Sequence, residues 1–139
     1  MQRVDITHEF SLPVERVYDH LAEHENLGPL FGARVRRVRD GDTSRNGAGS
    51  VRALRIGPGP WFEETTVEAV PHSRIVYRVT KGTPLRDHQG VMDFTPLGTG
   101  CRLHYVIEFR SVVPGLAKVV QLGLTRNITR GLRKVDQLA

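Results

Sequence analysis

Apolar and polar residues alternate along the first ten positions of the chain, and one parity is occupied by Val4, Ile6, His8 and Phe10. This period of two is typical of a strand with one buried face. After Pro13 the spacing changes to that of one helical face, with apolar positions at Val14, Val17, Tyr18 and Leu21. The sequence therefore predicts a strand over residues 1–10 and a short helix that ends near Glu23 or His24.

Six further runs with strand character follow between residues 33 and 110. Turn residues separate them, and short connections of this kind favour antiparallel pairing. The predicted strands cover residues 33–39, 49–56, 61–70, 75–80, 88–95 and 101–109. Residues 26–32, just before the first of these runs, are broken by Gly and Pro, so we expect them to pack as an irregular turn.

Helical spacing returns after Pro114-Gly115 and continues nearly to the C-terminus. One arc of about 120° is apolar and contains Ala117, Val120, Leu124, Ile128, Leu132, Val135 and Leu138. The opposite side carries Lys118, Arg126, Arg130, Arg133 and Lys134. These elements predict an α+β fold in one domain, residues 1–139, with a seven-stranded curved antiparallel sheet wrapped around the long terminal helix.

The 139 residues include 20 Lys and Arg against 15 Asp and Glu, a formal net charge of +5. Positive charge indicates a nucleic-acid partner only where it is clustered. The arginine-rich run at residues 34–39 is divided between both faces of its strand and lacks interleaved aromatic side chains for base stacking. We therefore expect no nucleic-acid partner.

Cys101 is the single cysteine, which excludes an intrachain disulfide and a zinc site built on two thiolates. The chain has no stretch of 18 apolar residues, and its first ten residues lack the apolar run of a secretion signal. We therefore expect a cytoplasmic protein without a transmembrane segment.

Four segments resemble one known family. They are residues 12–18 (LPVERVY), 71–77 (PHSRIVY), 90–96 (GVMDFTP) and 100–105 (GCRLHY). Together they resemble the START-like (helix-grip, SRPBCC) superfamily and, within it, the polyketide cyclase/dehydrase-like family. Tyr18 and Tyr105 stand where that family usually has Trp, and Cys101 stands where it usually has Thr. The resemblance implies a helix-grip fold whose cavity, between sheet and long helix, binds lipids, sterols, polyketides or other aromatic molecules.

Four residues are candidates for proton transfer or carbonyl polarisation: Glu64, His88, Tyr77 and Tyr105. Alternation places Glu64 on one face with Phe62, Thr66 and Glu68, and the resemblance also implies a glutamate here. A carboxylate in an apolar cavity would have a raised pKa, which suits a general acid or base. The alternative is a structural ion pair with Arg55 or Arg78. His8, on the inner face of the first strand, could also hydrogen-bond a ligand.

Residues 20–24 (HLAEH) match the pattern of inverted zinc proteases, with His20 and His24 four apart on one helical face. Both lie at the edge of the apolar stripe, so a solvated helix end is the favoured interpretation, and a histidine there also suits the helix dipole. We expect neither a metal site nor a cofactor.

A hydrophobic ligand would need a lining of aromatic and flexible apolar side chains. The candidates are Phe31, Trp61, Phe62, Leu85, Met92, Phe94, Phe109, Leu124 and Gly131. Trp61 and Leu85 belong to two hairpins, residues 57–61 and 81–86, expected at the cavity mouth. Gly131, on the inward arc of the long helix, would leave space for a ligand. The sequence leaves open whether these residues line a cavity or fill a solid core.

The first functional hypothesis is a binding module for a hydrophobic, lipid-like, aromatic or polyketide-like small molecule. The second is a polyketide cyclase, aromatase or dehydratase that uses a cavity Glu, His or Tyr. The third is an adaptor that meets an anionic membrane surface or a macromolecular partner through the basic face of the last helix. The ligand and the oligomeric state stay open.

Overall fold

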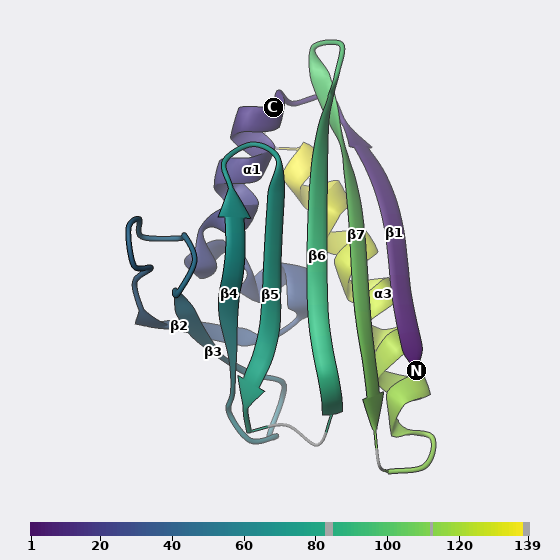
Figure 1. Ribbon diagram of the computed structural model, residues 1–139. Coiled ribbons are helices and arrows are strands. Elements are labelled where there is room, and N and C mark those ends of the chain that lie inside the picture. Colours follow the sequence, from purple (N-terminus) through teal and green to yellow (C-terminus); the bar gives the residue numbers. More distant parts are fainter. Residues whose placement is uncertain (83–84, 112, 138–139) are drawn as a thin grey trace.

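Seven strands form one antiparallel sheet in the computed structural model, which describes residues 1–82, 85–111 and 113–137 (Figure 1). The order across the sheet is β1-β7-β6-β5-β4-β3-β2. The strands are β1 (Gln2–Phe10), β2 (Arg34–Arg39), β3 (Val51–Arg55), β4 (Phe62–Val70), β5 (Arg74–Lys81), β6 (Leu85–Leu97) and β7 (Gly100–Ser111). Since sequential strands from β2 to β7 are neighbours, short hairpins build most of the sheet.

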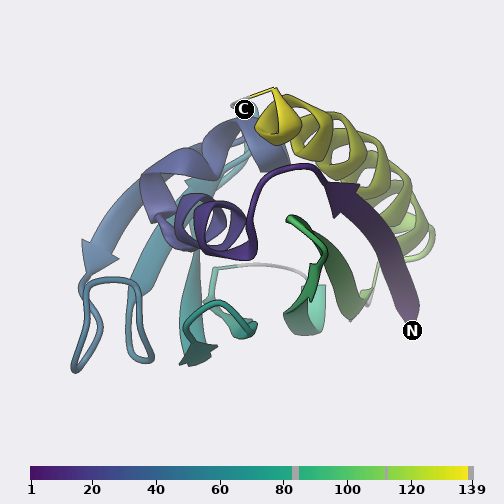
Figure 2. The same ribbon diagram turned by 90° about the horizontal axis from the view of Figure 1, so that it is seen from above.

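The helices all lie on one face of this sheet, which curves around them (Figure 2). They are α1 (Val14–Ala22), the short 3-10 helix η1 (His24–Asn26), α2 (Gly28–Phe31) and α3 (Leu116–Asp136). The first three connect β1 to β2, the strands at opposite edges of the sheet. The last helix packs along β1 and against α2. No helix in the described part of the chain is long and apolar enough to cross a membrane.

The predicted fold is confirmed: seven antiparallel strands, a short helix after the first and a long C-terminal helix. Some details differ from the prediction. Residues 26–32 form helical turns instead of an irregular one, although Leu27, Leu30 and Phe31 are buried as expected. The sixth strand begins at Leu85 instead of His88, so the second expected hairpin is shorter than residues 81–86. Positions 83–84 of that hairpin and Leu138 lie outside the described residues.

Two irregularities in strand pairing decide which side chains face inward. The register of β4 against β5 shifts between Thr66 and Glu68, so Glu68 is exposed and does not share the face of Glu64, contrary to the alternation prediction. In β6 the register shifts between Arg86 and Gln89, and Asp87 has a φ of 51°. Bulges of this kind re-aim side chains, and here His88 is buried while Asp87 is exposed.

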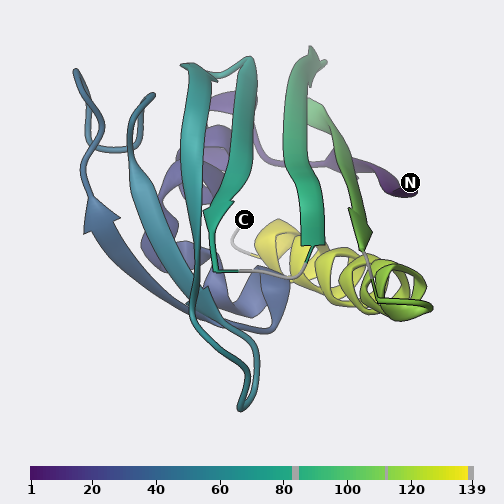
Figure 3. The same ribbon diagram turned by 60° about the horizontal axis from the view of Figure 1, so that its bottom comes forward.

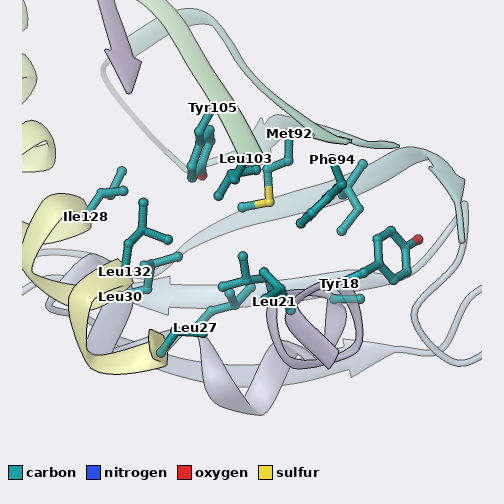
Figure 4. Close-up of a cluster of buried hydrophobic side chains, with 14 of the residues drawn as sticks. Tyr18, Leu21, Leu27, Leu30, Met92, Phe94, Leu103, Tyr105, Ile128 and Leu132 are labelled. Carbon is teal, nitrogen blue, oxygen red and sulfur yellow. The ribbon is translucent and has the colours of Figure 1, made fainter. Parts of the chain in front are cut away.

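A cluster of buried hydrophobic side chains lies where the helical segment meets β6 and β7 (Figure 4). Met92, Leu103 and Tyr105 from the strands face Leu21, Leu27 and Leu30 from the helical segment. The ring of Tyr18 meets that of Phe94 edge-on, with 5.2 Å between the ring centres. These side chains belong to one continuous buried cluster, which also includes Leu54, Tyr77 and Ile107.

Candidate functional site

A cavity of about 190 Å³ lies at the end of the inner face away from α1. The hairpin between β3 and β4, which projects beyond its neighbours in Figure 3, contributes to its rim. Its lining is Phe31, Leu54, Ile56, Gly59, Pro60, Phe62, Glu64, Tyr77, Gly82, Leu85, His88, Ile107, Leu116, Val120 and Leu124. An apolar cavity of about 150 Å³ is large enough for benzene, so this one has room for a ring compound.

A buried ion pair, Arg52 with Glu64, forms part of one wall. The two residues are directly opposite each other in the β3–β4 ladder. The Nε atom of Arg52 donates to Oε1 of Glu64 at 2.8 Å, and Nη2 lies 2.7 Å from the same oxygen. Both side chains are at most 5% exposed. Because both contacts fall on Oε1, Oε2 has no partner among the described residues and is left for a ligand.

Two tyrosines extend this wall toward β7. The guanidinium of Arg52 lies over the ring of Tyr77, 4.7 Å from its centre, and Phe31 lies 5.9 Å away. The hydroxyl of Tyr77 hydrogen-bonds that of Tyr105. Burial raises the pKa of both hydroxyls, and the nearby Glu64 also raises the pKa of Tyr77, so both stay protonated. We call Arg52, Glu64, Tyr77 and Tyr105 the polar layer.

Gly90 makes room for this layer. It is the direct neighbour of Tyr77 in the β5–β6 ladder. A Cβ atom at this position would overlap the ring of Tyr77. A glycine inside a strand often marks such a close approach, and here it lets the tyrosine ring lie across β6 and reach Tyr105.

His88 also lines the cavity and is 8% exposed. Its ring packs 5.4 Å from that of Phe109, and its Nδ1 is buried without a hydrogen-bond partner among the described residues. Burial is the main reason that its pKa is lowered, with Glu64 acting in the opposite direction. The imidazole is therefore neutral near pH 7 and can accept a proton.

Strands β5 and β6 stop pairing beside His88. Their ladder ends at Arg78 and Gln89, although β5 continues to Lys81. A second hollow occupies this split on the outer side, and its lining is Arg78, Val79, Asp87, His88 and Gln89. His88 thus borders both the cavity and the outer hollow.

Seven of the predicted site residues line the cavity: Phe31, Phe62, Glu64, Tyr77, Leu85, His88 and Leu124. Tyr105 lies behind Tyr77 and contributes through the hydrogen bond between their hydroxyls. Met92 and Phe94 belong to the solid core, and Phe109 is fully buried beneath His88. Trp61 lies outside the lining, where the guanidinium of Arg36 stacks 4.6 Å from its ring.

Gly131 allows helix α3 to pack closely against α2. A Cβ there would lie 2.9 Å from the Cα atom of Leu30, so the glycine lets α3 approach α2 closely. The residues of α3 that do face the cavity are Leu116, Val120 and Leu124, spaced one helical turn apart. Leu116 was not predicted, although it extends the stripe by one turn.

The predicted partners of Glu64 were wrong. Arg55 and Arg78 lie on the outer face of their strands, where Arg55 donates to the carbonyl of Gly59 and Arg78 to the side chain of Gln89. In β3 the side chains of Arg52 and Leu54 both face inward. Leu54 lines the cavity, and the sequence analysis missed it as well. Strict alternation back from the end of that strand would have found both.

The residues of the protease-like pattern are separated in space. Helix α1 ends at Ala22, so His20 and His24 do not share a helical face. His24 is buried, 3.3 Å from the hydroxyl of Ser50, whereas Glu23 pairs with Arg37 at 2.9 Å. His8 lies away from the cavity, with its Nε2 3.5 Å from a carboxylate oxygen of Asp136 in α3.

The outward face of α3 exposes Val119 and Leu122, 67% and 58% respectively, near the cations Lys118 and Arg126. Neither apolar side chain contributes to the cavity. A contact of this face with a membrane or a macromolecular partner stays a prediction.

Residues 1–139 match a family model described as "Polyketide cyclase / dehydrase and lipid transport". No curated protein matches the chain. Among solved structures, a START superfamily protein from Mycobacterium smegmatis is similar, with a TM-score of 0.79 and 16% identity over 99% of both chains.

Two further similar structures belong to proteins whose names include an enzyme activity or a biosynthetic pathway. One is norcoclaurine synthase from Thalictrum flavum in complex with dopamine and hydroxybenzaldehyde, with a TM-score of 0.71 and 13% identity over 99% of this chain and 85% of that one. The other is the di-domain ARO/CYC BexL from the BE-7585A biosynthetic pathway, with a TM-score of 0.73 and 18% identity over 99% of this chain and 46% of that one. At these identities the likeness shows a shared fold.

Proposed function

We propose, since the chain belongs to the polyketide cyclase/dehydrase and lipid transport family, that it binds a small apolar molecule with a ring system in the cavity beside the polar layer. The observation that carries this function is the cavity itself, whose lining is apolar apart from a few convergent groups. Ligand sites are typically built in this way, with apolar walls for affinity and few polar groups for orientation.

The polar groups lie where they would orient such a guest. Oε2 of Glu64 can accept a hydrogen bond from a ligand hydroxyl, and the neutral imidazole of His88 can donate or accept one. The remaining walls, which include Leu54, Phe62 and Leu124, offer only apolar contact. A phenol or hydroxylated aromatic group therefore fits the cavity itself better than a charged group.

A pair of tryptophan substitutions on α3 tests binding with 2-naphthol as the probe. Leu124→Trp fills the cavity, whereas Leu122→Trp adds the same side chain to the exposed face of the same helix. We expect calorimetric titration to show at least a tenfold loss of affinity for Leu124→Trp and less than a twofold change for Leu122→Trp. Equal affinities in the two variants, or no binding by the unaltered protein, would refute the function.

A second candidate function is acid–base catalysis of ring closure in a poly-β-keto substrate. It is supported by Glu64 and His88, which border the same cavity while His88 is held neutral. A neutral imidazole can take the proton from the carbon between two carbonyls. The resulting enolate can attack a second carbonyl of the same folded chain, and the alkoxide formed there can take the proton back from the imidazolium. The cavity would supply orientation, which lowers the barrier by holding the reacting carbons together.

His88→Gln and Glu64→Gln test this second candidate on a short poly-β-keto thioester. Loss of a general base typically lowers the rate by 10²- to 10⁴-fold, so we expect a fall of that size in kcat for the residue that moves the proton. The affinity for naphthalene, which has no hydroxyl to contact either residue, serves as the control for an intact cavity. Unchanged turnover in both variants would leave binding as the sole function.

A further inference from the structure

Arginines along the edge strand β2 differ in whether they have an acidic partner. Arg37 pairs with Glu23 and Glu25 at 2.9 Å, and Arg39 pairs with Asp42 at 2.8 Å. Arg34, at the start of the same strand, has no carboxylate partner among the described residues. The charge of this cation is therefore not neutralised within the described structure.

Arg34 also faces a second unpaired cation. It lies directly opposite Arg55 in the β2–β3 ladder. The Nε atom of Arg55 donates to the carbonyl of Gly59 at 2.9 Å, and its guanidinium too has no carboxylate partner in the described part of the chain. Like charges directly opposite each other destabilise a sheet. A bound anion would therefore stabilise this cross-strand pair.

Protection of a sheet edge explains only part of this arrangement. Charged residues on an edge strand prevent pairing with other chains, and that accounts for arginines on β2. Arg55 belongs to β3, which is paired on both sides and needs no such protection. Arg36 has a different partner, the ring of Trp61. Edge protection therefore does not explain why Arg55 lies opposite Arg34.

A hollow in the surface contains both guanidinium-bearing residues. Its lining is Gly28, Pro29, Gly32, Ala33, Arg34, Arg55 and Gly57, and we call it the arginine hollow. It adjoins the apolar cavity at two places in the chain, because Phe31 and Ile56 line the cavity while the next residues, Gly32 and Gly57, line the hollow. The lining of the hollow thus continues directly from that of the cavity at both points of the chain.

We infer that the arginine hollow binds the acidic end, a carboxylate or phosphate monoester, of an amphipathic ligand whose apolar body occupies the cavity. The inference rests on the proposed binding function and specifies its ligand class. A planar guanidinium presents paired donors that match two oxygens of such an anion. Two guanidinium groups that line one hollow gain more from a dianionic phosphate than from a single carboxylate.

Three probes with the same naphthalene body separate this ligand class from simple apolar binding. They are the neutral 4-(2-naphthyl)butanamide, the acid 4-(2-naphthyl)butanoate and the ester 3-(2-naphthyl)propyl phosphate, whose flexible tethers let the head group leave the cavity. Titrations at low salt should show at least tenfold tighter binding of the acid than of the amide. Tighter binding of the ester than of the acid would identify phosphate as the preferred head group, and the reverse would identify carboxylate.

Two double variants with the same loss of charge complete the test. Arg34→Gln/Arg55→Gln should abolish the preference for the acidic probes and leave the amide affinity within twofold. Arg130→Gln/Arg133→Gln, on the exposed side of α3, should leave the preference intact. Equal loss in both double variants would show that net charge alone is responsible and would overturn the inference.

The outcomes also separate the two proposals. If the amide binds and the acid binds no tighter, the arginine hollow is not an anion site, while the proposed binding function stands. If neither probe binds the unaltered protein, both are refuted. A preference that survives Arg34→Gln/Arg55→Gln places the anion elsewhere and overturns the inference as well.

Discussion

The two ends of the inner face use similar side chains and pack them differently. Near α1 and α2 the interior is solid: Leu21, Leu27, Met92, Phe94 and Leu103 are at most 5% exposed. Near the start of α3, Phe62, Leu85, Val120 and Leu124 are only partly buried and surround an open space. The polar layer lies between them, with Leu54 and Ile107 on its hollow side.

This difference indicates that stability and the proposed binding depend on separate parts of the fold. Close packing contributes most of the free energy of folding, and the solid end supplies it. At the hollow end, apolar surface stays available for a guest, whose binding would stabilise the folded state in turn. The comparison can be tested at the boundary, at each end and through the pH dependence of stability.

The largest effect is expected at the boundary, for Glu64→Leu. This change leaves the guanidinium of Arg52 buried without its partner, which typically costs about 3–5 kcal/mol. Denaturant unfolding measures the loss. The matched control is Glu9→Leu, which breaks the exposed Glu9–Arg102 pair and should cost no more than about 1 kcal/mol. Similar losses in both variants would show that the buried pair does not stabilise the boundary between the two ends.

The next effect distinguishes the ends directly through two leucine truncations. Leu103→Ala at the solid end removes a fully buried side chain and should cost about 2–5 kcal/mol. Leu124→Ala at the hollow end enlarges an existing space and should cost clearly less in the same unfolding assay. Equal costs would mean that the hollow end is packed in solution and would contradict the difference described here.

The smallest effect concerns His24, a buried histidine at the solid end. Burial and the nearby Arg52 and Arg37 lower its pKa to about 3. Because the unfolded chain binds this proton near pH 6.5 and the folded chain does not, stability is complete above that pH and falls as the pH decreases toward 3. Between pH 7.5 and 5.5 the loss should be roughly 1–2 kcal/mol.

His24→Gln checks this by unfolding at a series of pH values, since it should flatten the curve between pH 7.5 and 5.5. His88 also has a lowered pKa, so His88→Gln should remove a further part of the same slope. An unchanged slope in His24→Gln would show that this histidine is already solvated and that the solid end is looser than its packing indicates.

Most of the fold could be predicted from the sequence because it depends on periodicity. The strand alternation around Tyr77 and Tyr105 and the helical spacing of Val120 and Leu124 place these side chains inward, as found. Such patterns are local, and they survive wherever the backbone is regular.

The candidate site was harder to predict because it depends on register and on irregular backbone. The partner of Glu64 is Arg52, which lies opposite it in the β3–β4 ladder. The register between two strands cannot be predicted from the pattern of either strand alone. The inward turn of His88 depends on the bulge at Asp87. From the sequence alone, Gly90 indicates only a glycine that weakens its strand. Its role is seen in the structure, where the ring of Tyr77 lies across it.

The early end of the β5–β6 ladder has a consequence for how fast a guest would come and go. Beyond Arg78 and Gln89 the described residues of these two strands share no ladder pairing, so this stretch is held less firmly than the rest of the sheet. Local opening of this stretch would admit or release a molecule past His88 while the rest of the sheet stays intact. Residence time would then be governed by this local seam and would not follow the rate of global unfolding.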